Sequence, residues 1–282
     1  MKKLIALDMD GTLLTDHKTI SPENKQAIKD AQSDGHTVMI CSGRPHASLK
    51  AFLVEEGFGD LPMSASNGTV TIVDNQVINQ VVMNHMDAKK VFEWLTKHHF
   101  PFCLYTDQTV FNHANFFEWA WQDARLRSDF EERKTEFARI EDYFRKISEA
   151  EFNEWEELSD DLGIFKFFVL TSISERKKLL EDFSRTIAGI MFTSSFPDNV
   201  EISDVDGHKG TGITAVANHF GINMKDTVAM GDNFNDIGML KVAGLSVAMG
   251  NAEEDIKAMA DVVTLTNEEH GVAHAIREYV LK

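Results

Sequence analysis

Short runs of apolar residues, each followed at once by small or polar residues, recur near both ends of the chain. Between these runs, apolar side chains return at the spacing of a helix. A run that is apolar without alternation is typical of a strand buried on both faces, and such strands form parallel sheets covered by helices. The pattern predicts strands at Leu4–Leu7, Val38–Cys41, Thr227–Met230, Leu245–Met249 and Val262–Leu265.

One of the intervening helices has clear boundary signals. Ser21 precedes Pro22 and Glu23, an order typical of an N-cap and a first helical turn. Gly35 lies where this helix should end. Strands that alternate with such helices indicate an α/β domain with a parallel sheet, and we assign residues 1–83 and 205–282 to it.

The middle of the chain, residues 84–204, differs from both ends because it is rich in Phe, Trp and acidic residues. Its apolar runs, Phe102–Tyr105 and Phe165–Thr171, are less uniform. Helical patterns at Asp87–His98 and Ser174–Ile187 each precede a predicted strand. We therefore predict an inserted α+β domain of about 120 residues, a size common for domains.

The net charge of the chain disfavours two classes of partner, nucleic acids and anionic membranes. Lys and Arg total 28 against 45 Asp and Glu, which gives a formal net charge of -17. Such a balance opposes binding to the phosphate backbone of nucleic acids and to an anionic membrane surface. The acidic stretch Glu149–Asp161 is interpreted as the solvated face of a helix. The oligomeric state is not indicated.

The sequence pattern does not indicate a signal peptide, a membrane span or a disulfide framework. Asp8 and Asp10 interrupt the first apolar run too early for a signal peptide, and no segment approaches the roughly 20 apolar residues of a membrane span. Cys41 and Cys103 are too few for a disulfide framework, so we expect buried thiols. A soluble cytoplasmic protein is the expectation.

Polar residues follow the predicted strands at the edge where parallel strands bring their carboxyl ends together. These residues are Asp8, Asp10, Gly11, Thr12, Ser42, Gly43, Arg44, Gly231, Asp232, Asn235 and Asp236. Carboxylates packed closely repel one another unless a cation lies among them. Hard oxygen ligands without His or Cys favour Mg²⁺, and with one lysine such an ion would let a phosphate dianion approach. Lys209 is the best placed lysine.

Asp8 and Asp10 stand two apart, so an extended backbone turns both side chains the same way. One can attack phosphorus while the other handles the proton. A calcium loop is disfavoured because Leu13 stands where an EF-hand requires Gly. A second Asp-x-Asp-Gly string, at 204–207, follows the alternating run Glu201–Ser203 of a half-exposed strand, and we interpret it as a turn.

The motifs, in their order along the chain, resemble the four signature motifs of the haloacid dehalogenase-like superfamily, and within it the Cof-type (subclass IIB) phosphatases. They are Asp8-Met9-Asp10-Gly11-Thr12-Leu13, Ser42-Gly43-Arg44, Lys209, and Gly231-Asp232-Asn233-Phe234-Asn235-Asp236. The resemblance covers only the two ends of the chain. It implies a Rossmann-like parallel-sheet core with an inserted α+β cap at residues 84–204 that selects the substrate.

The resemblance also implies roles for individual residues. Asp8 would be the nucleophile that becomes an aspartyl phosphate, and Asp10 the general acid and then the base. Ser42 would bond the phosphoryl group, and Lys209 would bridge nucleophile and phosphate. Mg²⁺ would be held by the Asp8 and Asp232 carboxylates and the Asp10 carbonyl.

Further positions match less central parts of the family pattern. Asn235 and Asp236 look like its supporting pair, one near the phosphate and the other near the lysine or metal. Gly43, Arg44 and Asn67 match positions near the substrate.

An acid at position 10 favours protonating an alkoxide leaving group, as in phosphomonoester phosphatases and phosphomutases of this family. Only 34 positions separate Asp8 from Ser42, whereas 167 separate Ser42 from Lys209, so the insertion resembles the larger α/β cap. We predict a Mg²⁺-dependent hydrolase of small phosphorylated metabolites, with sugar phosphates as the expected substrates. A phosphomutase with the same intermediate, and a non-catalytic sensor of phosphorylated metabolites, are the alternatives.

Overall fold

The computed structural model describes residues 1–195 and 197–281, which form two compact units. The first, the core unit, comprises Met1–Gln80 and His208–Lys282, and the second, the inserted unit, comprises Val81–Gly207. The chain therefore leaves the core unit after Gln80 and re-enters it at His208, three residues outside the expected insertion at either end.

An eight-stranded sheet forms the centre of the core unit, with strand order β14-β13-β12-β1-β2-β3-β4-β5. Neighbouring strands from β14 to β3 run parallel, as predicted, and the pairs β3–β4 and β4–β5 are antiparallel. The strands are β1 (Leu4–Asp8), β2 (Thr37–Cys41), β3 (Met63–Ala65), β4 (Val70–Val73), β5 (Gln76–Gln80), β12 (Thr227–Gly231), β13 (Leu245–Ala248) and β14 (Val262–Val263).

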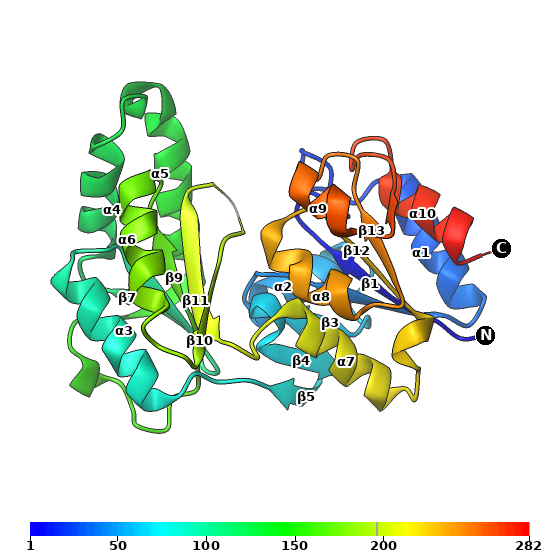
Figure 1. The fold of residues 1–282 in the computed structure, drawn as a ribbon, viewed down its shortest axis with the longest axis horizontal. Coiled ribbons are helices and arrows are strands. Elements are labelled where there is room, and N and C mark those ends of the chain that lie inside the picture. The colour runs from blue at the N-terminus through cyan, green and yellow to red at the C-terminus, as the bar shows by residue number, and fades with distance from the viewer. Residues whose placement is uncertain (196, 282) are drawn as a thin grey trace. The chain divides into compact units, whose positions relative to one another are not determined.

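Helices cover both faces of this sheet, with α1 and α10 on one side and α7 and α8 on the other (Figure 1). Every residue of β1 and β12 is buried, as strands between two helical layers must be. The Ser21 hydroxyl caps α1 by accepting the Asn24 N–H at 3.2 Å, so the predicted start of this helix is confirmed. The helices are α1 (Pro22–Ser33), α2 (His46–Glu55), α7 (Lys209–His219), α8 (Ile237–Val242), α9 (Glu254–Met259) and α10 (Gly271–Tyr279).

The inserted unit is an α+β structure on a six-stranded sheet of order β10-β11-β9-β6-β7-β8, antiparallel except for the pair β7–β8. One apolar core joins α3 and α6 to this sheet through side chains such as Phe92, Phe167 and Leu180. Its elements are α3 (His85–Lys97), β6 (Phe102–Thr106), β7 (Val110–His113), α4 (Phe116–Arg125), α5 (Phe130–Ile147), β8 (Ser148–Phe152), β9 (Ile164–Leu170), α6 (Ser174–Ser184), β10 (Ile190–Thr193) and β11 (Asn199–Asp204).

The acidic stretch Glu149–Asp161 is not a helix, so that prediction is wrong. Its first part belongs to β8, where Glu149 and Glu151 are exposed at alternate positions, and a short 3₁₀ turn follows at Trp155–Glu157. Pairing with β7 and burial of Trp155 hold this segment in place. Charge alone does not distinguish a solvated helix from an edge strand, because both expose charged side chains.

The run Glu201–Ser203 was expected to be half exposed, and this is also wrong, because both faces of β11 are buried. The Glu201 carboxylate forms an ion pair with Lys166 at 3.0 Å, and these side chains are only 2% and 1% exposed. A polar residue that finds a partner can lie inside a sheet. The turn expected next is confirmed, since the Asp206 N–H donates to Asp204 Oδ1 at 2.9 Å.

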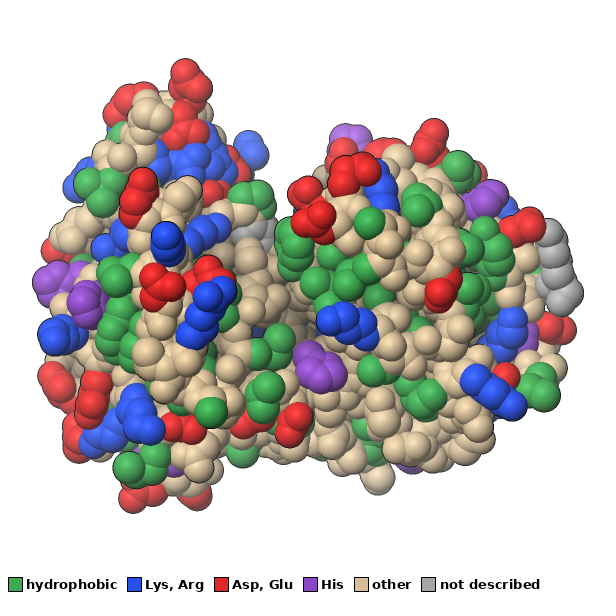
Figure 2. Space-filling model, in the orientation of Figure 1, with side chains coloured by type: hydrophobic (Ala, Val, Ile, Leu, Met, Phe, Trp, Pro, Cys, Tyr) green, Lys and Arg blue, Asp and Glu red, His purple; other side chains and the backbone are tan. Residues whose placement is uncertain are grey.

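Cys41 and Cys103 are buried free thiols, as expected. In the part of the chain that the structure describes, no helix has the length and apolar character needed to cross a membrane. On the face shown in Figure 2, lysine and arginine side chains are interspersed with aspartate and glutamate rather than gathered in one patch.

Candidate active site

The register of the central strands brings distant segments of the core unit together. Asp8, the last residue of β1, lies opposite Cys41 of β2, and Leu7 lies opposite Met230 of β12. The residues that follow these positions therefore leave the sheet at the same edge. The chain continues from β1 to β2 on one side, whereas β12 lies on the other, and such a switch point opens a crevice at the carboxyl ends of the strands.

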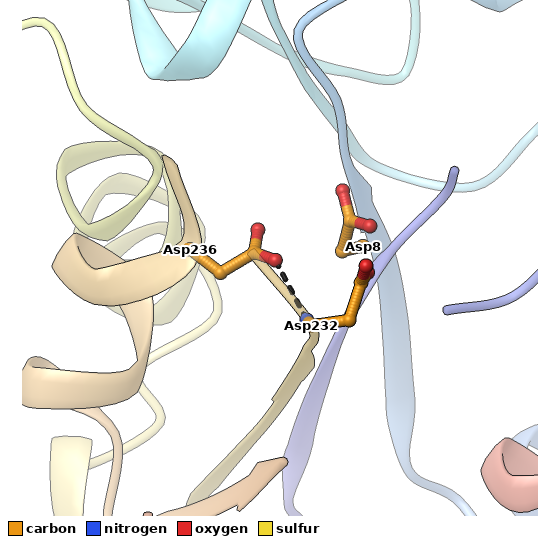
Figure 3. A group of neighbouring side chains, drawn as sticks. All are labelled: Asp8, Asp232 and Asp236. Carbon is orange, nitrogen blue, oxygen red and sulfur yellow. Dashed lines mark hydrogen bonds between the residues drawn. The ribbon is translucent and has the colours of Figure 1, made fainter. Parts of the chain in front are cut away.

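Three carboxylates meet at this edge. Figure 3 shows Asp8 and Asp232, from the ends of β1 and β12, and Asp236 from the adjoining turn, converging on one space. Oxygen atoms from the three side chains lie within 4.8 Å of one another. Asp8 and Asp236 are buried and Asp232 is partly buried, so little water screens their mutual repulsion.

Lys209 links two of these carboxylates. It is the first residue of α7, its side chain is fully buried, and its ammonium donates to Asp8 and, at 2.5 Å, to Asp236. With all three carboxylates ionised, one ammonium leaves a local excess of two negative charges. The resemblance implied that Lys209 lies beside Asp8 and that either Asn235 or Asp236 lies near the lysine or metal; in the structure Asp236 is the residue that bonds Lys209.

The ionisation of these groups reflects that excess. Burial, reinforced by the nearby Asp236 charge, raises the pKa of Asp8 well above its usual range. The same two causes raise the pKa of Asp232 to about 6. Burial opposes the charged form of Lys209, but the Asp236 and Asp8 carboxylates outweigh it and raise the pKa of this lysine. A divalent cation would remove the excess, and an all-carboxylate donor set suits Mg²⁺.

The turn after β12 is held by the Asp236 carboxylate. Its Oδ2 accepts the backbone N–H groups of Asp232 at 2.9 Å and Asn233 at 3.0 Å. A Cβ on Gly231 would lie 2.6 Å from the Asp236 Cβ, so this close approach requires glycine. Asp236 therefore orients both Asp232 and Lys209.

Gly11 and Thr12 hold the other side of Asp232. The Thr12 hydroxyl donates to Asp232 Oδ1 at 2.7 Å. Gly11 has a φ of +88°, and a Cβ there would lie 2.4 Å from Asp232 Oδ2. The sequence placed both residues at this edge but did not indicate that they contact Asp232.

The Asp10 carboxylate forms separate ion pairs. Arg44 donates to it through Nε and Nη2, both at 3.0 Å, and Lys18 donates at 3.0 Å. Burial opposes ionisation of this carboxyl, but Arg44 and then Lys18 outweigh it and lower the pKa of Asp10. Lys18 was not predicted, because a lysine in a polar loop gives no sequence signal. Its φ of 60° is unusual for a residue other than glycine.

Ser42, Gly43 and Asn67 lie on the β2 and β3 side of this edge. Ser42 is buried, its hydroxyl accepts the Arg44 N–H at 3.2 Å, and its carbonyl accepts the Asn67 N–H at 2.9 Å. Asn67 Oδ1 accepts from Asn235 Nδ2 at 3.2 Å, and a Cβ on Gly43 would lie 3.0 Å from the same oxygen. The structure thus brings the predicted positions 43, 67 and 235 together.

Two consecutive non-glycine residues at this edge, Ser66 and Asn67, have left-handed backbone conformations. Ser66, Asn67 and Gly68 have consecutive φ values of 48°, 60° and 96°, and all three residues are buried. Such left-handed residues are costly unless their surroundings impose them, and they tend to occur at functional sites.

The chain matches one protein family and is similar in sequence to many known proteins. The family model for the haloacid dehalogenase-like hydrolases matches residues 5–276. The chain is 31% identical over 281 residues to the phosphatase YwpJ of Bacillus subtilis, and this alignment covers 98% of this chain and 99% of the relative. It is 29% identical over 286 residues to the pyridoxal phosphate phosphatase YbhA of Escherichia coli, with 99% of each chain covered.

Solved structures agree with this result. A haloacid dehalogenase-like hydrolase from B. subtilis superimposes with a TM-score of 0.84 at 28% identity, covering 99% of this chain and 100% of the other. The subclass IIB sugar phosphatase BT4131 has a TM-score of 0.81 at 23% identity, covering all of both chains, and at this identity the likeness concerns the fold.

Proposed function

This chain belongs to the haloacid dehalogenase-like hydrolases and is a phosphatase of phosphorylated small molecules, and from that premise we propose that it is Mg²⁺-dependent and works through an aspartyl phosphate on Asp8. The observation that carries the proposal is the buried Lys209 ammonium, which bonds Asp8 and Asp236 beside Asp232. A phosphate dianion can approach Asp8 only where the charge of these carboxylates is neutralised.

The metal site we propose uses the Asp8 and Asp232 carboxylates and the Asp10 carbonyl. The all-oxygen donors and the two excess negative charges of the cluster support it. When bound, Mg²⁺ supplies positive charge to the oxygens of the transferring phosphoryl group. We assign Asp236 to orienting Lys209 and Asp232, because its oxygens are already bonded to both residues.

Two displacements at phosphorus complete the proposed reaction. In the first, an Asp8 carboxylate oxygen forms a bond to phosphorus, the bond to the leaving oxygen breaks, and Asp10 gives that oxygen a proton. In the second, water attacks the aspartyl phosphate, Asp10 takes a proton from this water, and the bond between Asp8 and phosphorus breaks. Asp10 ends in its starting protonation state, and phosphate is released.

The ion pairs of Asp10 add a requirement to this scheme. In the free protein Arg44 and Lys18 favour its ionised form, which is the base needed for the second displacement. To act first as an acid, Asp10 must lose part of this stabilisation and gain a proton. We propose that the substrate's phosphate draws Arg44 away, because a dianion competes for a guanidinium better than a single carboxylate does.

The remaining residues are assigned to binding. We propose that Ser42 and Asn235 bond the phosphoryl oxygens, with Gly43, Arg44 and Asn67 beside the substrate. We assign the choice of leaving group to the inserted cap, residues 84–204, and propose sugar phosphates as substrates. Named relatives act on different phosphorylated substrates, pyridoxal phosphate for YbhA and 5-amino-6-(5-phospho-D-ribitylamino)uracil for YcsE of B. subtilis.

The decisive test compares one aspartate from each of the two Asp-x-Asp-Gly strings, at 8–11 and 204–207. Asp8→Asn should lower kcat for p-nitrophenyl phosphate by at least about a thousandfold, because it removes the nucleophile. Asp206→Asn is the control and should keep its activity, since Asp206 lies in a turn of the inserted unit. Greater damage from the Asp206 change would refute the assignment of the nucleophile.

A further inference from the structure

His208 occupies the point where the chain re-enters the core unit. It is the N-cap residue of α7, with extended dihedrals of φ -129° and ψ 160°. The Thr211 N–H is directed toward two atoms of His208, the ring Nδ1 at 3.3 Å and the backbone carbonyl oxygen at 2.9 Å. An imidazole thus performs at this helix start the task that a short polar side chain usually performs.

Three glycines from separate segments surround His208. A Cβ on Gly68 would lie 2.0 Å from the His208 carbonyl oxygen. A Cβ on Gly238 would lie 2.8 Å from the ring Nδ1, and one on Gly210 would lie 3.0 Å from this atom and 2.3 Å from the Gly238 carbonyl oxygen. The absence of side chains at Gly68 and Gly238 therefore leaves room for the backbone and the ring of His208, and Gly210 lets α7 approach α8 beside this ring.

The neighbours of His208 include the residues that position the charged cluster. Lys209 follows it directly, and Gly238 is the second residue after Asp236, the partner of the Lys209 ammonium at 2.5 Å. The His208 ring therefore contacts both the start of α7, which carries Lys209, and the start of α8, which follows Asp236. A lysine has a flexible four-carbon stem, so its ammonium is placed accurately only if its backbone is fixed.

We propose that His208 is a positioning residue for Lys209: its imidazole fixes the first turn of α7 against α8, and so holds the ammonium between Asp8 and Asp236. This inference rests on the proposed role of Lys209 in the phosphoryl transfer. In this proposal His208 acts through Lys209, the residue that follows it at the start of α7, and not on the substrate.

Three substitutions at this position separate the capping atom from the ring. His208→Asn keeps an N-cap acceptor, His208→Phe keeps a ring without one, and His208→Ala keeps neither. We expect Ala and Phe to lower kcat about 10- to 100-fold, the usual effect of a small misplacement in an active site, and Asn to recover most of the loss. His219→Ala, an exposed histidine at the far end of the same helix, is the matched control.

A double-substitution cycle tests whether the effect passes through Lys209. Lys209→Gln should be severely impaired, and adding His208→Phe to it should cause little further loss at high enzyme concentration, because the group to be positioned is gone. The same fold-loss in both backgrounds would assign His208 a general structural role and overturn the inference. Circular dichroism checks that each variant is folded.

The outcomes also separate this inference from the proposed function. If Lys209→Gln kept full activity, the proposed chemistry would fail at Lys209 itself. If Lys209→Gln lost activity while His208→Phe matched the wild type, only the positioning role would be overturned. Should His208→Ala not fold, the contrast between Asn and Phe still decides the question.

Discussion

Gly11 and Gly35 have the same backbone dihedral, φ +88°, in different surroundings. A Cβ at Gly35 would meet nothing within 4 Å, whereas one at Gly11 would lie 2.4 Å from Asp232 Oδ2. Gly35→Ala should therefore cost only the backbone strain of a left-handed residue, about 1 kcal/mol of unfolding free energy, with kcat unchanged. Gly11→Ala should have the same backbone strain and should also lose most of its kcat, because the Asp232 side chain must move.

Steady-state kinetics and calorimetry on the two variants test this prediction. Equal kcat values for both would mean that the position of Asp232 does not depend on Gly11.

His113 is a buried histidine in the inserted unit and is only 1% exposed. Its Nδ1 accepts the Asn115 N–H at 3.1 Å, and its ring stacks on Trp119 with centroids 4.6 Å apart. Burial lowers its pKa from 6.5 to about 4. Between these values the unfolded chain binds a proton that the folded chain does not, so this histidine destabilises the fold progressively as pH falls from 6.5 toward 4.

Replacing His113 by Phe removes this titration. We expect the wild type to lose on the order of 3 kcal/mol relative to His113→Phe between pH 7 and pH 4. All four tryptophans lie within residues 81–207, so their fluorescence in urea titrations reports unfolding of the inserted unit. His219→Gln, at an exposed position of the core unit, is the control. Parallel stability curves for wild type and His113→Phe would contradict the prediction.

At the scale of elements, α7 must lie close to β3 for Lys209 to reach Asp8. Gly212 permits this approach, since a Cβ there would lie 2.0 Å from the Ser64 hydroxyl. Alanine favours a helix over glycine by about 1 kcal/mol, yet we expect Gly212→Ala to be destabilised by about 1–3 kcal/mol through overpacking, with a reduced kcat. Chemical denaturation and kinetics measure both effects.

A second change tests the cause. Ser64→Gly in the Gly212→Ala background should restore part of the stability and of kcat, because it removes the clashing side chain. Asn218→Ala, exposed on the same helix, should be neutral. No rescue by Ser64→Gly would place the origin of the defect elsewhere.

For the molecule as a whole, the proposed metal should couple activity to stability. Excess EDTA should silence hydrolysis of p-nitrophenyl phosphate, and Mg²⁺ should restore it. Because an ion that binds only the folded state stabilises it by mass action, Mg²⁺ should also raise the Tm. Asp232→Asn should abolish this rise, since it removes a ligand, whereas Asp206→Asn should keep it. Full activity in the chelator would refute the metal proposal.

Local patterns were sufficient for β1, β2, β12 and β13 and for the cap of α1, but β14 is shorter than predicted and β3, β4 and β5 were not predicted. Buried strands and N-caps depend on residues close in the chain, so apolar runs and Ser21 identify them without knowledge of the partners. The same reasoning was wrong at Glu149–Asp161 and Glu201–Ser203, where strand pairing and a buried ion pair with Lys166 decided the outcome. Whether a charged residue is exposed depends on its partner, and the partner is distant in sequence.

The sequence by itself determined which residues stand at the carboxyl ends of the strands, because that follows from where each apolar run stops. Only the tertiary structure decided that the Lys209 ammonium bonds Asp236 as well as Asp8, that Lys18 and Arg44 hold Asp10, and that glycines 68, 210 and 238 enclose His208. These contacts join segments far apart in the chain. They depend on strand register and on how closely helices approach the sheet, which no local pattern encodes.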